Sequence, residues 1–303
     1  MRAVFLGTPS EAVPSLRALV GVADVALVVT RPDRPRGRSG RLRSPRIKEV
    51  ADDLGITVTQ PGTAVDLLEA IAAAAPDVGV VTAFGRILGP EVLGIPPSGF
   101  VNIHFSLLPR WRGASPVVRA ILAGDDATGV TLMALDAGLD TGPTIASIGT
   151  TIGDDETAGE LTGRLAEMGG DLLGEILPGY VNGELEPRAQ DESAATAAGR
   201  ILRDEAHIDP QRHSPDAVIR AVRAFNPRPG AWTTLHGDTF KVWRAAAAGG
   251  SAEPGVVVFD GERALLGVLG GVVELVEVQV AGRGRLPGAD WMRGRRGDPA
   301  VLV

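Results

Sequence analysis

The 303-residue chain contains no cysteine. This absence excludes disulfide bonds, thiolate metal sites and a thiol nucleophile. Histidine is scarce as well, since its four copies stand at positions 104, 207, 213 and 236 and show no spacing typical of metal ligands. We therefore expect no metal ion in the functional site.

The chain also lacks long hydrophobic runs, because no apolar stretch reaches the roughly 20 residues that a membrane-spanning helix needs. Its first residues enter an expected strand at 3–6 and then a Gly-Thr-Pro turn, which is unlike a secretory signal. We expect a cytoplasmic protein without membrane attachment. The net charge of −7 excludes a uniformly basic surface, so any RNA contact must come from a local patch.

The first half of the chain alternates between strand-like and helix-like segments. With 44% hydrophobic and 22% charged residues, the composition is that of a globular protein long enough for two domains. Apolar strands that alternate with helices predict a mostly parallel, doubly wound, Rossmann-like α/β sheet. The expected strands lie at 3–6, 25–30, 56–59, 77–83 and 100–103, and the expected helices at 10–20, 47–54, 65–74, 114–123 and 155–177.

The second half has a different pattern. Residues 183–196 are polar and contain Pro187, which predicts a linker. After one more helix at 215–225, five short β-rich runs separated by glycine turns indicate a small β-barrel. These runs lie at 231–235, 239–244, 255–259, 264–268 and 271–280. We therefore expect a catalytic domain at 1–182, a linker at 183–203 and a barrel domain at 204–303.

The central motif is Asn102-Ile-His104, at the end of an expected buried strand. Strand alternation places Asn102 and His104 on one face, where ligands bind in open α/β sheets. An Asn amide can stabilise the oxyanion that forms at a formyl carbonyl, and a neutral His can take a proton from an amine. A buried structural histidine beside a turn asparagine is the alternative for so short a motif.

Longer motifs surround this pair. Residues 102–109 read Asn-x-His-x-Ser-Leu-Leu-Pro, residues 111–116 read Trp-Arg-Gly-Ala-x-Pro, and residues 138–142 read Gly-Leu-Asp-Thr-Gly. Together they resemble the folate-dependent formyltransferases, and most of all the methionyl-tRNA formyltransferases. The likeness continues through residues 223–229 and Lys-Val-Trp at 241–243, and it implies an OB-like C-terminal barrel that contacts tRNA.

The resemblance implies transfer of a formyl group from 10-formyltetrahydrofolate to the α-amine of initiator methionyl-tRNA. It assigns catalysis to Asn102, His104 and Asp140. Sequence position alone leaves Asp136 as a competing carboxylate, and a turn-forming role is the ordinary one for such aspartates. The residues implied in folate binding are Ser106, Leu107, Leu108, Pro109, Phe84, Gly85, Arg86, Ile87 and Leu88.

Residues 31–48 hold seven arginines and one lysine against a single acid. A charge run is usually a solvated loop, but this one matches the family loop that enters the tRNA acceptor stem. We expect Arg36, Arg38, Arg41 and Arg43 to bind tRNA phosphates. A second basic cluster, Arg283, Arg285, Arg293, Arg295 and Arg296, either assists RNA binding or forms a mixed-charge tail.

Other acceptors remain open. Glycinamide ribonucleotide formyltransferases share the Asn-x-His motif but are shorter, and formyltransferases acting on nucleotide-linked aminosugars lack the arginine-rich loop. A folate-dependent hydrolase or a non-catalytic RNA-binding module are alternatives from other classes. The linker departs from the family pattern at residues 196–200, where Thr-Ala-Ala-Gly-Arg lacks the usual aromatic residue. We expect a monomer.

Overall fold

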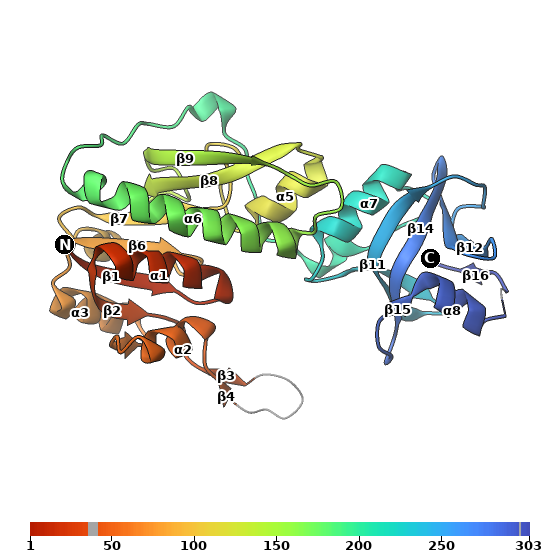
Figure 1. The fold of residues 1–303 in the computed structure, drawn as a ribbon, viewed down its shortest axis with the longest axis horizontal. Helices are drawn as coiled ribbons and strands as arrows, with labels where there is room; N and C mark the ends of the chain where they lie inside the picture. Colours follow the sequence, from red (N-terminus) through yellow and green to blue (C-terminus); the bar gives the residue numbers. More distant parts are fainter. Residues whose placement is uncertain (36–41, 297) are drawn as a thin grey trace. The chain divides into compact units, whose positions relative to one another are not determined.

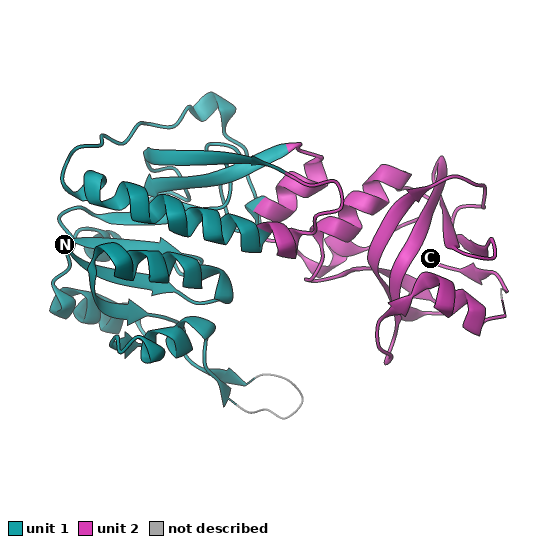
Figure 2. Cartoon of the chain, viewed as in Figure 1, with its two compact units in different colours: residues 1–116, 127–151, 162–199 teal, residues 117–126, 152–161, 200–303 magenta. Residues whose placement is uncertain are grey.

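The computed structural model describes residues 1–35, 42–296 and 298–303. Arg36, Arg38 and Arg41, which the sequence assigns to tRNA binding, lie outside the described residues. The chain forms two compact units (Figure 2). Unit 1 comprises Met1–Pro116, Ala127–Thr151 and Thr162–Gly199, and unit 2 comprises Val117–Asp126, Ile152–Leu161 and Arg200–Val303.

Unit 1 is built on a seven-stranded sheet with the order β5-β2-β1-β6-β7-β8-β9 (Figure 1). The first five strands run parallel, and β8 and β9 are antiparallel additions at one edge. Every residue of β6 is buried, as expected for a strand covered on both faces. This arrangement confirms the predicted fold class. The strands are β1 (Arg2–Gly7), β2 (Asp24–Val29), β5 (Val58–Thr59), β6 (Val78–Thr82), β7 (Phe100–His104), β8 (Ala127–Ala134) and β9 (Thr144–Thr151).

Helices connect these strands, and their starts follow local signals. The clearest is the capping box of α3, in which the Thr63 hydroxyl accepts the Asp66 amide and the Asp66 carboxylate accepts the Thr63 amide. The long helix α6 continues past Pro178, although the sequence predicted an end at residue 177, and the Tyr180 hydroxyl in its last turn donates to the Ser98 carbonyl. The helices are α1 (Val13–Val22), α2 (Arg46–Asp53), α3 (Ala64–Ala74), α4 (Pro90–Leu93), α5 (Pro116–Ala123) and α6 (Ala158–Val181).

A segment that we call the connector, residues 182–199, follows α6 and belongs to unit 1. It has one short 3₁₀ turn, Glu192–Ala194, and is otherwise irregular. Its backbone nevertheless forms bridges with two parts of unit 1, because Arg188 pairs with Thr144 at the start of β9 and Ala197 pairs with Arg112. The connector is therefore a fixed part of this unit.

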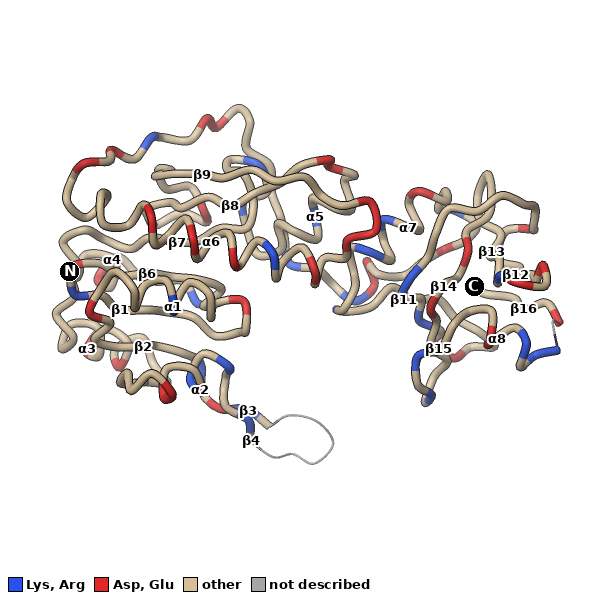
Figure 3. The backbone as a smooth tube through the Cα atoms, viewed as in Figure 1, with Lys and Arg blue, Asp and Glu red and all other residues tan. Residues whose placement is uncertain are grey.

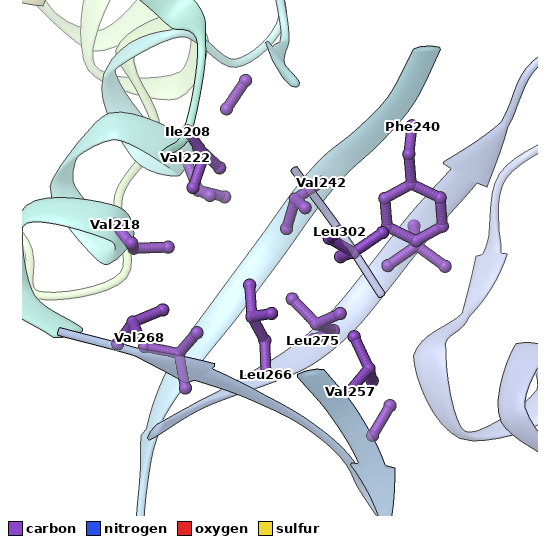
Figure 4. Packing of buried hydrophobic residues seen from close by; sticks show 14 of the residues in the cluster. Ile208, Val218, Val222, Phe240, Val242, Val257, Leu266, Val268, Leu275 and Leu302 are labelled. Carbon is purple, nitrogen blue, oxygen red and sulfur yellow. The ribbon is translucent and has the colours of Figure 1, made fainter. Parts of the chain in front are cut away.

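Unit 2 contains a curled antiparallel sheet of order β10-β11-β14-β13-β12-β16, with β15 paired to β14. This sheet corresponds to the predicted small barrel, and its apolar side chains, such as Val242, Leu266 and Val268, form one core cluster with Val218 and Val222 of α7 (Figure 4). The sequence missed α8. The elements are α7 (Pro215–Ala224), β10 (Ala231–Leu235), β11 (Asp238–Ala248), β12 (Val256–Phe259), β13 (Ala264–Val268), β14 (Gly271–Val280), β15 (Leu286–Pro287), α8 (Gly288–Gly294) and β16 (Ala300–Val301).

Within the described parts of the chain, none of the helices combines the length and the apolar character that crossing a membrane requires. In the same parts, no group of histidine and carboxylate side chains is arranged to hold a metal ion.

Candidate active site

His104 is the last residue of β7 and is buried, with 5% of its surface exposed. Its Nε2 atom lies 2.9 Å from the carbonyl oxygen of Trp111. A carbonyl oxygen only accepts hydrogen bonds, so this contact assigns the proton of a neutral imidazole to Nε2. The other ring nitrogen, Nδ1, then carries a lone pair that can accept a proton.

Asp140 is the carboxylate that faces this lone pair. Its Oδ2 atom lies 3.6 Å from His104 Nδ1 and accepts a hydrogen bond of 2.8 Å from the Gly113 amide. A separation of 3.6 Å is too long for a direct hydrogen bond. Nδ1 is therefore available to a substrate proton, and the carboxylate is close enough to stabilise the imidazolium that would result.

The competing carboxylate, Asp136, has a different environment. Its Oδ1 atom accepts hydrogen bonds from the Gly138 amide at 3.0 Å and the Thr141 hydroxyl at 2.8 Å. These contacts are those of an aspartate that closes its own turn. Asp140 itself adopts a left-handed backbone with φ of 54°, which aspartate tolerates better than most residues. The geometry thus separates two carboxylates that sequence position could not.

Asn102, His104 and Asp140 all line one cavity of about 530 Å³. Its remaining wall is largely apolar and includes Leu135 and Leu139 from the loop after β8. This volume lies within the range of small-molecule sites. Asp136 lines the same cavity, so the cavity holds a second carboxylate besides these three polar side chains.

The loop after β6 forms another part of the cavity lining. All five residues predicted from this loop, Phe84, Gly85, Arg86, Ile87 and Leu88, line the cavity. Two arginines hold this loop in place. Arg31, from outside the loop, donates a hydrogen bond to the Gly85 carbonyl. Arg86, within the loop, donates from Nη1 to the Pro61 carbonyl at 2.9 Å. Ile87 is 87% exposed, which leaves an apolar side chain at the mouth of the cavity.

Residues 106–109, the other segment predicted to bind folate, are not part of this lining among the described residues. Ser106 is buried and donates its hydroxyl proton to the Arg110 carbonyl at 2.6 Å. The Leu108 amide donates to the Thr131 hydroxyl of β8 at 3.1 Å. The segment therefore closes on itself and on β8, and it supports the loop that carries Trp111.

Several residues that hold the site were missed by the sequence analysis. The Trp111 amide donates to the Thr196 hydroxyl at 2.8 Å, and the backbones of Arg112 and Ala198 pair beside it. Gly113 has φ of 125°, and a Cβ atom there would lie 2.7 Å from the Ala198 carbonyl oxygen. Only glycine fits this close approach of the connector.

The arginine-rich segment, residues 31–48, contains two short paired strands, β3 (Arg34–Pro35) and β4 (Leu42–Arg43), where Figure 3 shows basic residues on the chain. Arg43 is exposed and pairs across the hairpin with Arg34. At its base, Asp33 forms an ion pair of 3.2 Å with Lys48 and accepts a hydrogen bond of 2.7 Å from Gln60. These hydrogen bonds, that of Gln60 foremost, lower the pKa of the Asp33 carboxyl.

Comparison with known proteins identifies the family of the chain. Residues 1–177 match the family described as Formyl transferase, and residues 200–296 match the family described as Formyl transferase, C-terminal domain. The chain belongs to the formyl transferase family.

Two relatives in this family match along almost their full length. A methionyl-tRNA formyltransferase from Myxococcus xanthus is 43% identical over 298 residues, which cover 97% of this chain and 95% of that protein. A methionyl-tRNA formyltransferase from Halorhodospira halophila is 45% identical over 308 residues, which cover 100% of this chain and 99% of that protein. The resemblance noted in the sequence motifs therefore extends through both units.

Solved formyl transferase structures share the fold at lower identity. An N-formyltransferase from Helicobacter canadensis, in complex with folinic acid and dTDP-3-aminofucose, superposes with a TM-score of 0.68 at 20% identity, covering 90% of this chain and 98% of that chain. Such a likeness establishes the fold and leaves the acceptor to be argued from other features.

Proposed function

We propose that this formyl transferase moves the formyl group of 10-formyltetrahydrofolate to the α-amine of initiator methionyl-tRNA. The observation that carries the proposal is the free Nδ1 atom of His104 facing the Asp140 carboxylate, 3.6 Å away, inside an apolar cavity. The choice of acceptor is supported by relatives named methionyl-tRNA formyltransferase that match over 97–100% of this chain.

In this proposal the amine attacks the formyl carbon, a C–N bond forms, and the carbonyl oxygen becomes an oxyanion. A free α-amine titrates near 7.7–8.0, so a large share is neutral at the pH of the cell and no strong base is needed. His104 Nδ1 accepts the proton that the amine loses, and Asp140 stabilises the imidazolium. The bond from carbon to N10 then breaks, and the proton passes to N10 of the departing tetrahydrofolate.

Asn102 stabilises the oxyanion through its side-chain amide. It lies two residues before His104 on β7 and lines the same cavity, so its NH₂ group is available to a carbonyl held between them. The donor's pterin ring occupies the apolar recess along residues 84–88, where backbone groups supply its hydrogen bonds. Residues 106–109 act indirectly, by supporting the loop that carries Trp111.

The proposal also divides the chain into successive functional segments. Residues 1–182 form the catalytic domain, residues 183–203 the linker and residues 204–303 a tRNA-binding domain. In unit 2, the Arg285 guanidinium lies 3.6 Å from the centre of the Trp243 ring, with Lys241 also near this ring. Burial lowers the pKa of the Lys241 ammonium, and the nearby charges of Arg203 and Arg285 lower it further. The Trp243 ring is buried, whereas the Arg285 side chain on it is 43% exposed and is the group that this proposal offers to an RNA phosphate.

The same proposal places the protein in the cytoplasm, where aminoacyl-tRNA is used, and describes it as a monomer. His104, Asp140 and Asn102 all come from unit 1 of one chain, so the site needs no residue from a second copy. Light scattering during gel filtration tests the monomer, for which a mass near 31.4 kDa is expected.

The experiment that tests the function is a formylation assay with 10-formyltetrahydrofolate and two alternative acceptors, methionylated initiator tRNA and a dTDP-linked aminosugar. We expect formyl-methionyl-tRNA and no formylated sugar. Asp140→Asn should lower kcat by about 10²–10⁴-fold because the imidazolium loses its counter-charge. Asp136→Asn makes the same chemical change in a turn-forming aspartate and should cost much less. Formylation of the sugar alone would overturn the choice of acceptor.

A further inference from the structure

Two irregular loops carry the groups that the reaction uses. The loop after β7 supplies the Trp111 carbonyl that fixes His104 and the Gly113 amide that fixes Asp140, and the loop at 138–142 carries Asp140 itself. Neither loop is held by the hydrogen-bond pattern of a helix or strand along its length. Displacing reacting groups by about 1 Å can cost roughly 10²-fold in rate, so something must fix these loops relative to each other.

One side chain of the connector contacts both loops. The Gln190 amide nitrogen donates to the main-chain carbonyls of Asp140 at 3.0 Å and Gly142 at 2.7 Å. The Gln190 carbonyl oxygen accepts a hydrogen bond of 2.9 Å from Arg112 Nε, in the loop after β7. A single half-buried amide therefore joins the loop that carries Asp140 to the loop that carries Trp111 and Gly113.

The chemistry of the partners sets the orientation of this amide. A guanidinium only donates hydrogen bonds and a main-chain carbonyl only accepts them, so the oxygen of Gln190 must face Arg112 and its nitrogen must face Asp140 and Gly142. Arg112 is fixed in turn by a two-pronged ion pair with Glu192, at 2.7 and 2.8 Å. The hydrogen bonds that Arg112 donates lower the pKa of the Glu192 carboxyl, which favours the ionised form of the pair.

We propose that Gln190 is a positioning residue for the formyl-transfer reaction, because it holds the Asp140 carboxylate against the Gly113 amide and beside His104. This inference rests on the proposed function for its catalytic consequence. Gln190 contacts backbone atoms of Asp140 and Gly142 and is not part of the cavity lining in the described chain, so it acts through Asp140.

Gln190→Glu and Gln190→Ala test the inference. Glutamate keeps an oxygen for Arg112 but cannot donate to the two carbonyls, so it removes the contact to the Asp140 loop alone. We expect both variants to lower kcat by about 10–100-fold, with KM for the folate donor and for methionyl-tRNA within about threefold of the original. The control is Glu186→Gln, an exposed position on the same connector that should retain full activity.

A second readout does not depend on activity. The Gly113 amide is buried and donates to Asp140 Oδ2, so its hydrogen exchange reports whether that contact persists. In Gln190→Glu and Gln190→Ala it should exchange at least about tenfold faster, while amides inside β7 keep their protection. The thermal midpoint of the control and of both variants should stay within a few degrees of the original, which separates loop positioning from unfolding.

The outcomes are distinct. Original kcat in Gln190→Glu overturns the positioning role, and so does a loss of activity that appears as a raised KM, because Gln190 would then shape binding rather than alignment. Unchanged exchange at Gly113 overturns it as well. If the unmodified chain fails to formylate methionyl-tRNA, the proposed function fails, and the exchange measurement still decides whether Gln190 holds Asp140.

Discussion

Asn102 lies in the middle of an otherwise buried strand, with Val101 and Ile103 packed on either side of it in the chain. A polar side chain at such a position needs a hydrogen-bonding partner when it is closed off from water. The partner in the proposed reaction is the formyl oxygen, whose negative charge grows in the transition state. In this proposal Asn102 therefore contributes to the rate more than to binding of the ground state.

Asn102→Ala should lower kcat by about 10²–10³-fold, with both KM values nearly unchanged, because one oxyanion donor is lost. Steady-state kinetics with each substrate varied in turn measures this split. Asn102→Asp is the matched variant, since it keeps the shape and removes the donor, and it should be at least as slow. Turnover within about threefold of the original in Asn102→Ala, with an unchanged thermal midpoint, contradicts the role.

Some residues of the site could be predicted from the sequence and others could not. Strand alternation was sufficient to bring Asn102 and His104 to one cavity. Sequence position could not choose between Asp136 and Asp140, and only the family resemblance selected Asp140, because both residues follow the same strand and the bonds of Asp136 to its own loop appear only in the folded turn. Gln190 left no signal, since its partners are main-chain carbonyls that every residue possesses.

At the scale of elements, the parallel strands were predicted almost residue by residue because their continuous apolar runs are unambiguous. The antiparallel strands β8 and β9 were not predicted. β9 is largely exposed and reads Thr-Ile-Ala-Ser-Ile-Gly-Thr-Thr, which is a weak strand pattern. Its pairing with β8 along seven residues, from Ala127 opposite Thr151 to Met133 opposite Thr144, supplies the stability that local propensity lacks.

The connector, residues 182–199, is a segment whose contacts the sequence could not predict. A polar segment with a proline was predicted to be a linker between the two domains. Composition could not predict that its backbone approaches Gly113 or pairs with Thr144, because these contacts depend on the fold of residues more than forty positions earlier.

The arginine-rich segment, residues 31–48, is the part of the chain whose proposed role is most directly testable. Replacing Arg36, Arg38, Arg41 and Arg43 together by glutamine should raise KM for methionyl-tRNA by about 10–100-fold and spare KM for the folate donor. The dependence of tRNA binding on salt should also become shallower, by up to about one unit of slope per lost phosphate contact.

Filter binding at several salt concentrations measures this slope. A variant with Arg212 and Arg263 replaced by glutamine removes exposed arginines of unit 2, each near an aspartate three positions away, and serves as the charge control. If the loss of tRNA affinity per replaced arginine is the same in this control and in the four-arginine variant, net charge governs binding and the arginine-rich segment has no special role.

For the whole molecule, the ionised carboxylates predict sensitivity to acid. Several have a lowered pKa because hydrogen bonds or cations stabilise the charged form, namely Asp33, Asp66, Glu160, Asp191, Glu192, Glu205 and Asp260. A carboxyl whose pKa is lower in the folded state than in the unfolded state stabilises the fold when the pH is above the unfolded-state pKa, which is near 4. That contribution is lost as the pH falls through the folded value. The thermal midpoint should therefore fall between pH 5 and 3.

Glu160 makes this prediction specific. Its pKa is lowered mainly by the Thr157 amide, in the capping box that starts α6, and its side chain is 53% exposed. Glu160→Gln should lower the thermal midpoint at pH 7 by about 1–3 °C, a small change because exposed charges are screened. The difference between the variant and the original should shrink as the pH falls from 5 to 3, because protonation of Glu160 removes its contribution. Scanning calorimetry at pH 7 and pH 3 measures the difference, and an equal gap at pH 3 contradicts the assignment.

The order in which the chain is synthesised bears on unit 2. Its apolar core includes Leu302, the second-last residue, while Val118 and Leu122 pack against the same core from the middle of the chain. On the ribosome these two side chains emerge long before the strands that cover them. These two apolar side chains therefore remain exposed until the strands of unit 2 have been synthesised and can fold over them.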